Sequence, residues 1–325
     1  MTATRKSSRA DLDLLAELER LGVKGITERQ LERWRQAGAI PSPGRRFLGR
    51  GKGSISAYPK GTADRVVRLK ELLGRGRTLS KAVLVMFGEG YPVEERALKR
   101  AYQWMFNQGS ADLMRMASRT DPSLGELEGD APDPEDLADA AGAPLAARIQ
   151  RMTVGRAMRR NVRRLPDRKE SVDSMMQSVF SNLALLMTTG RPFSEEGIIE
   201  LVGAVGVAPH TLDRDRFLEA AERMMLPALE AVLAGATLDE LEAARDLAAA
   251  FVVALEREAR QALLPVGGHA VEAGWQIMGA ASVEMGDLAV PINAAVLLGF
   301  TALTGASVVD EAKRFREYTE VIVTE

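Results

Sequence analysis

A run of positively charged side chains without counter-charges is the first chemical feature of the sequence. Residues 33–63 contain seven Lys and Arg and no Asp or Glu, although acids slightly outnumber bases in the whole chain. Guanidinium and ammonium groups donate charge-assisted hydrogen bonds to phosphate oxygens. This stretch therefore predicts the edge of a nucleic-acid interface. The residues expected to follow a row of phosphates, from a glycine-rich loop, are Arg45, Arg46, Arg50 and Lys52.

A short helix is expected just before this loop. The segment TERQ at residues 27–30 is a capping box, in which Thr27 and Gln30 would satisfy free backbone N–H groups. Leu31 and Trp34 then form an apolar face, and Gly38 would end the helix after about three turns. Such a helix can present polar side chains to base edges in a major groove. Its opposite face carries the candidate base or phosphate contacts Arg29, Arg33 and Gln36.

Other elements must hold this helix and the basic loop in place. Apolar spacing predicts one helix before them, within residues 11–25, and several more after the loop. The loop itself predicts a β-hairpin, or wing, with a flexible glycine-rich tip. The residues expected to anchor its two arms are Phe47 and Leu48 on one side and Ile55 and Tyr58 on the other.

This order of elements resembles the N-terminal DNA-binding domain of the MerR family of transcriptional regulators. The matching segments are LLAELERLG, TERQLERWRQAGAIPSP, Tyr58 at the end of the wing, and VVRLKELLGRGRTLSKAV, within about residues 12–105. The resemblance implies a winged helix-turn-helix at residues 1–110 that binds double-stranded DNA as a homodimer and distorts a promoter. The DNA contacts expected from the pattern and the resemblance are Thr27, Arg29, Arg33, Arg35, Gln36, Arg45, Arg46, Arg50, Lys52 and Tyr58.

The sequence departs from the family pattern at two places. The family usually has an Arg, two aromatic residues and an acid where Glu32, Arg33, Trp34 and Arg35 stand, and an Arg where Ser56 stands. The basic groups are shifted and not lost. The detailed base contacts of this chain are therefore expected to differ from those of the family.

Charge divides the chain into a basic head and an acidic body. Residues 1–105 contain 22 Lys and Arg against 11 Asp and Glu, and the remaining residues contain 21 against 34. Only the head is therefore expected to meet a polyanion. Residues 111–146 are interpreted as an acidic, proline-containing linker with a short helix at 135–141, and residues 147–325 as an all-helical domain for sensing or dimerisation. The expected fold class is all-α, with a C-terminal helical bundle and the small wing.

The methionine-rich helices of residues 147–325 allow two interpretations. They could pack into an aliphatic core, or they could enclose a pocket for a small apolar effector. The basic run at residues 148–169 likewise allows two interpretations. It could contact nucleic acid, or it could pack against the acidic body. The expected lining of an effector pocket is Phe180, Met187, Met224, His269, Trp275 and Met278.

Several classes of function are not expected from the composition. The absence of Cys and the presence of only two His argue against disulfides and transition-metal sites. The segment GRGKGS at residues 49–54 lacks the spacing and the following helix of a phosphate-binding loop, so no cofactor is expected. The apolar residues 288–304 are fewer than the roughly 20 of a membrane span, and the first 15 residues contain no apolar run that resembles a secretory signal. We expect a cytoplasmic protein that is neither an enzyme nor bound to a membrane.

Sequence-specific transcriptional regulation is the function expected from these observations. One alternative is a DNA-architectural or recombination-accessory protein of the excisionase kind, although such factors need little beyond the head. The other is an enzyme with an appended DNA-binding head, which would need titratable residues that converge in a pocket of the body.

Overall fold

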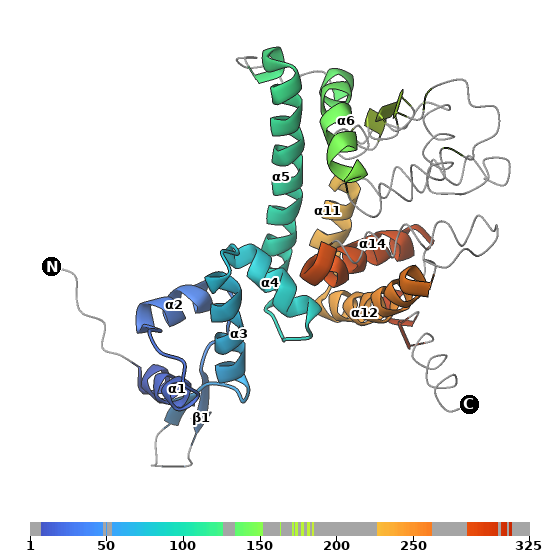
Figure 1. Ribbon diagram of the computed structural model, residues 1–325. Coiled ribbons are helices and arrows are strands. Elements are labelled where there is room, and N and C mark those ends of the chain that lie inside the picture. The colour runs from blue at the N-terminus through green and yellow to red at the C-terminus, as the bar shows by residue number, and fades with distance from the viewer. Residues whose placement is uncertain are drawn as a thin grey trace. The chain divides into compact units, whose positions relative to one another are not determined.

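In the part of the chain that it describes, the computed structural model is mostly helical, with one small β-hairpin (Figure 1). The expected all-α class is confirmed for the part of the chain that the structure describes. The chain divides into two compact units, Met1–Met105 and Phe106–Glu325. The described residues are 8–47, 50, 54–125, 134–151, 226–261, 285–304 and isolated positions within 163–184 and 307–313.

The helices of the first unit begin where the sequence supplies capping residues. The hydroxyls of Ser8, Thr27 and Thr78 each accept a hydrogen bond from the backbone N–H of the third residue onward, which satisfies a free donor at the helix start. The predicted capping box at Thr27 is confirmed. The helices of this unit among the described residues are α1 (Arg9–Arg20), α2 (Glu28–Gln36), α3 (Thr62–Gly74), α4 (Leu79–Gly88) and the first turns of α5 (Glu95–Thr120).

The core of the first unit forms where the apolar faces of these helices meet. Leu31 and Trp34 of α2 are 0% and 2% exposed, so the apolar face predicted for this helix is confirmed. Helix α1 contacts α2, α3 and the second strand of the hairpin. Phe87 of α4 and Tyr102 of α5 pack edge to face, with ring centroids 6.4 Å apart.

The predicted hairpin is present as β1 (Gly44–Phe47) paired antiparallel with β2 (Ser54–Ala57). Its anchoring differs from the expectation, because Phe47 is 80% exposed and Ile55 is 42% exposed. Among the described residues each strand pairs only with the other, and β2 also contacts α1. Tyr58, directly after β2, is the expected anchor that is partly buried. Leu48 lies outside the described residues.

The C-terminal end of α2 is held against the start of α5. Gly38 has a φ of +71°, and a Cβ atom at this position would lie 2.7 Å from the Cβ of Ala97. The guanidinium Nη2 of Arg100 donates a hydrogen bond of 3.0 Å to the carbonyl oxygen of Ala37. A glycine is therefore required here both by the backbone conformation and by the close approach of α5.

The described elements of the second unit are all helical. Helix α14 packs against both α11 and α12. No described helix is long and apolar enough to cross a membrane. The elements are the remainder of α5, η1 (Pro122–Gly125), α6 (Pro134–Gln150), α11 (Leu226–Gly235), α12 (Leu238–Gln261), η3 (Gly286–Leu288) and α14 (Ala289–Thr304).

The structure differs from the expected linker at residues 111–146. Residues 111–120 continue α5, and residues 134–146 belong to α6, which is longer than the helix expected at 135–141 and includes Pro144. Leu113 and Ala117 of α5, like Leu137 and Ala141 of α6, are buried and lie four residues apart along their helices. Their apolar surface stabilises helices in segments whose acids and prolines had indicated a solvated chain.

We expect Gly38→Ala to lower the free energy of unfolding by about 2–4 kcal/mol, because a left-handed conformation and a steric clash with Ala97 act together. Urea denaturation followed by circular dichroism measures the change.

Gly22→Ala is the matched control for this substitution. Gly22 has a similar φ of +78°, but no atom lies within 4 Å of an added Cβ. Gly22→Ala should lower the free energy of unfolding by only about 1–2 kcal/mol, which is the cost of the left-handed backbone conformation alone. Equal losses of unfolding free energy in Gly38→Ala and Gly22→Ala would contradict the close approach of α5 to the end of α2.

Candidate nucleic-acid interface

The exposed face of α2 carries the three side chains predicted for it. Arg29, Arg33 and Gln36 are all exposed, on the side of the helix opposite Leu31 and Trp34. Neither arginine has an ion pair or hydrogen bond to another described residue. The Gln36 amide nitrogen donates a 2.9 Å hydrogen bond to Glu32 Oε1 one turn earlier. This face therefore offers two free guanidinium groups and one amide to a ligand.

Thr27, another expected DNA contact, is used by the helix itself. Its hydroxyl accepts a 3.3 Å hydrogen bond from the Gln30 backbone N–H, and its own backbone N–H donates a 2.9 Å hydrogen bond to Gln30 Oε1. The residue is exposed, and its cap holds the first turn of α2 in place. In the structure its role is to position the helix.

Arg35 and Tyr58 lie inside a hydrogen-bonded network with Asp11. The Arg35 Nη1 donates to Asp11 Oδ1 and to the Tyr58 hydroxyl, and the Tyr58 hydroxyl donates to Asp11 Oδ1, each at 2.6 Å. The Arg35 Nη2 also pairs with Glu32. The side chains of Arg35 and Asp11 are only 13% and 8% exposed. The network joins α1, α2 and the end of β2.

The charges in this network compensate one another. Burial acts to raise the pKa of Asp11, but hydrogen bonds from Tyr58 and Ser8 and the positive charge of Arg35 outweigh it, so the pKa lies below its ordinary value. Burial raises the pKa of the Tyr58 hydroxyl, and its hydrogen bond to Asp11 raises it further. Asp11 is therefore ionised and Tyr58 neutral at pH 7, and the Arg35 charge is neutralised by carboxylates.

The structure therefore separates Arg35 and Tyr58 from the other expected DNA contacts. Their polar groups are occupied within the first unit, so they position α2 and the hairpin instead of forming the exposed face. Asp11 is the residue that the sequence interpretation missed. Its only local signal is its place in the first turn of α1, where the Ser8 hydroxyl donates a 2.7 Å hydrogen bond to its Oδ2.

The structure describes the side chains of only some of the basic residues expected on the hairpin. The side chains of Arg45 on β1 and of Arg50 in the connecting loop are exposed, and neither has a partner among the described residues. The backbone of Arg46 lies in β1, opposite Ile55. Lys52 lies outside the described residues.

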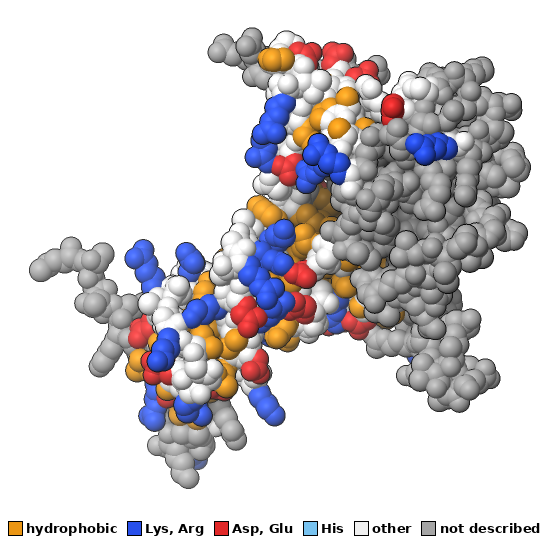
Figure 2. Space-filling view, viewed as in Figure 1, with side chains coloured by type: hydrophobic (Ala, Val, Ile, Leu, Met, Phe, Trp, Pro, Cys, Tyr) orange, Lys and Arg blue, Asp and Glu red, His pale blue; other side chains and the backbone are white. Residues whose placement is uncertain are grey.

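Other basic residues of the first unit are occupied in holding the unit together. Arg68 of α3 pairs with Glu89 at the end of α4 and, at 2.9 Å, with Glu71. The Lys70 ammonium donates a hydrogen bond to the carbonyl of Lys24 in the loop between α1 and α2. Basic and acidic side chains are interspersed over much of this unit (Figure 2). The exposed arginines of α2 and the hairpin differ from Arg68 and Lys70 in having no partner among the described residues.

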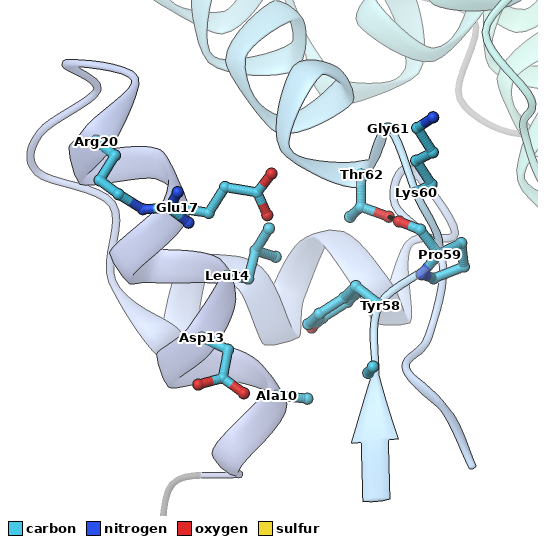
Figure 3. Close-up of a pocket in the computed structure, with 11 residues that line it drawn as sticks. Ala10, Asp13, Leu14, Glu17, Arg20, Tyr58, Pro59, Lys60, Gly61 and Thr62 are labelled. Carbon is cyan, nitrogen blue, oxygen red and sulfur yellow. Dashed lines mark hydrogen bonds between the residues drawn. The ribbon is translucent and has the colours of Figure 1, made fainter. Parts of the chain in front are cut away.

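A pocket of about 290 Å³ lies between α1 and the turn from β2 to α3 (Figure 3). The Tyr58 ring and Leu14 point toward each other at its inner end (Figure 3). The Thr62 hydroxyl donates a 2.7 Å hydrogen bond to the Pro59 carbonyl and fixes the turn. The charged residues of the lining have both signs, so the pocket does not favour a phosphate. They are Asp13, Glu17, Arg20 and Lys60.

The expected effector pocket falls on residues outside the described part of the chain. No group of His, Asp or Glu among them could hold a metal ion. Effector binding by residues 147–325 therefore stays a prediction. The residues expected to line that pocket, all outside the described part of the chain, are Phe180, Met187, Met224, His269, Trp275 and Met278.

Comparisons of the chain with protein-family models, curated proteins and solved structures find no match. The resemblance to the MerR pattern therefore rests on the residues of the sequence.

We expect Asp11→Asn to lower the free energy of unfolding by about 2 kcal/mol at pH 7, because it removes the charge that pairs with Arg35. The pKa of Asp11 is lowered on folding, so the contribution of its carboxylate is complete above the unfolded value of about 3.9 and is lost as the pH falls through the folded value. The difference between variant and wild type should therefore shrink at pH 3. Urea denaturation at the two pH values measures it.

Asp13→Asn is the control, since Asp13 is exposed on the same helix and has no partner among the described residues. It should change stability by less than about 0.5 kcal/mol. An Asp11→Asn loss of the same size at pH 7 and pH 3 would contradict the ionised network.

Proposed function

We propose that this chain is a sequence-specific DNA-binding transcriptional regulator. The exposed face of α2 carries the proposal: Arg29, Arg33 and Gln36 stand on a capped helix whose opposite face is buried. A rigid helix with free guanidinium and amide groups has the chemistry needed to read base edges.

In this proposal α2 enters the major groove of a DNA duplex. Arginine can donate two hydrogen bonds to the O6 and N7 of guanine, and glutamine can pair with the N6 and N7 of adenine. The exposed Arg45 and Arg50 of the hairpin bind phosphates beside the helix, which fixes the register of the helix without reading sequence. Tyr58, directly after β2, is hydrogen-bonded to Arg35 of α2 and Asp11 of α1, which holds the hairpin and α2 at a constant spacing.

The order of elements supports a MerR-like winged helix-turn-helix. Helices α1 and α2, the hairpin, α3 and α4 follow one another as the MerR pattern requires. Helix α2 has only 9 residues, and one helix of this length contacts too few base pairs for useful specificity. We therefore propose that the chain acts as a homodimer on two half-sites, in the cytoplasm.

Substitutions in α2 and in the hairpin should have different effects on DNA binding. Arg33→Ala should weaken binding to the preferred duplex by about 1–3 kcal/mol and leave a scrambled duplex almost unaffected, because a base contact is lost. Arg50→Ala should lower the affinity for both duplexes equally. It should also lower the number of counterions released on binding, measured from the salt dependence of the affinity, by about one. Fluorescence anisotropy at several salt concentrations measures both, on a duplex that the full chain selects from a random-sequence pool.

Arg119→Ala provides the control, since Arg119 is an exposed arginine near the end of α5 and outside the proposed interface. Its affinities should equal those of the wild type. Selection of no duplex by the wild type would refute DNA recognition. A uniform loss in Arg33→Ala with a selective loss in Arg50→Ala would reverse the roles of helix and hairpin.

A further inference from the structure

Phe47 is an aromatic side chain that the fold leaves in solvent. It is 80% exposed, the largest exposed fraction among the large hydrophobic side chains of the described residues. It stands at the last position of β1, paired with Ser54 across the hairpin. Ser54 is small and itself exposed, so it provides no apolar cover. The ring of Phe47 therefore buries little surface and contributes little to the core.

The register of the hairpin places Phe47 on the same face as Arg45. Side chains two residues apart on a strand point to the same side of a sheet, so Arg45 and Phe47 share one face. Ile55 is paired with residue 46 and therefore lies on the other face. The exposed ring thus stands next to an exposed guanidinium that has no partner among the described residues, and Arg50 follows it in the loop.

The charges around Phe47 restrict the kind of partner that can cover it. Residues 33–63 contain no acid, so a partner that approaches the hairpin is expected to be negatively charged. The partner must also offer an apolar surface narrow enough for one ring. A DNA minor groove meets both requirements, because its rims are phosphates and base pairs stack along its floor. A two-stranded hairpin whose strands have 4 residues each is slender enough to approach such a groove edge-on.

We propose that Phe47 enters the minor groove of the bound duplex and inserts against a base-pair step, while Arg45 and Arg50 hold the phosphates on either side. This inference rests on the proposed DNA binding and extends it, because it assigns to the hairpin an apolar contact with the bases in addition to its phosphate contacts. Side chains such as phenylalanine partly unstack a step and favour sequences whose steps open easily. The hairpin then contributes to sequence preference through deformability of the DNA.

The test uses the full chain and the duplex that it selects from a random-sequence pool, with 2-aminopurine placed in turn at the steps beside the α2 site. Wild-type protein should raise the fluorescence of the probe at one step, because an unstacked base is less quenched. Phe47→Ala should abolish the rise and lower the affinity by about tenfold, with an unchanged salt dependence. Phe47→Leu, which keeps an apolar wedge, should retain most of both effects.

Ile55→Ala is the matched control, an exposed apolar side chain of the same hairpin on the opposite face. It should leave the fluorescence rise and the affinity unchanged, and circular dichroism should show all variants folded. Wild-type affinity and fluorescence in Phe47→Ala would overturn this inference and leave DNA binding intact. Loss of self-association in Phe47→Ala, with DNA binding intact, would also overturn the inference. It would show that a second copy of this chain, and not DNA, covers Phe47. Selection of no duplex by the wild type would overturn the proposed function itself.

Discussion

The buried ion pair between Asp11 and Arg35, completed by the Tyr58 hydroxyl, is the interaction on which the geometry of the first unit depends. It joins three segments that are far apart in the sequence: the first helix, the second helix and the end of the hairpin. Among the described residues the four-residue strands pair only with each other, so the hairpin is tied to the helices through the contact of β2 with α1 and the hydrogen bonds of Tyr58. A charged pair at this junction requires correct geometry, because an unpaired charge would be costly to bury.

This network also explains how the unit divides its arginines. Arg35 and Arg68 are paired with carboxylates and hold elements together. Arg29 and Arg33 stand on the exposed face of α2 without a partner in the described structure. Because the paired arginines are neutralised locally, the positive potential of the unit comes mainly from the unpaired ones. The proposed interface combines such unpaired arginines with their place on the exposed face of one capped helix.

Local patterns predicted the elements well, whereas contacts between distant residues were beyond the sequence. The capping box at Thr27 and the apolar pair Leu31 and Trp34 depend on neighbours within one or two turns, so α2 could be predicted. Arg35 belonged to the same pattern, but its partner Asp11 lies 24 residues away, and nothing in the spacing indicated that the pair would meet. The exposure of Phe47 could not be predicted either, because an apolar residue in a strand pattern is ordinarily assigned to a core.

Genome-wide DNA enrichment with the full chain, compared with the same experiment on an Arg29→Ala, Arg33→Ala double variant, tests whether the exposed face of α2 recognises DNA. Recognition by this face predicts discrete peaks upstream of genes for the wild type, with a shared sequence, and loss of these peaks in the variant although the protein stays folded. Broad coverage of the genome, or one attachment site alone, would favour an architectural or recombination-accessory role. Peaks that persist unchanged in the double variant would contradict recognition by the exposed face of α2.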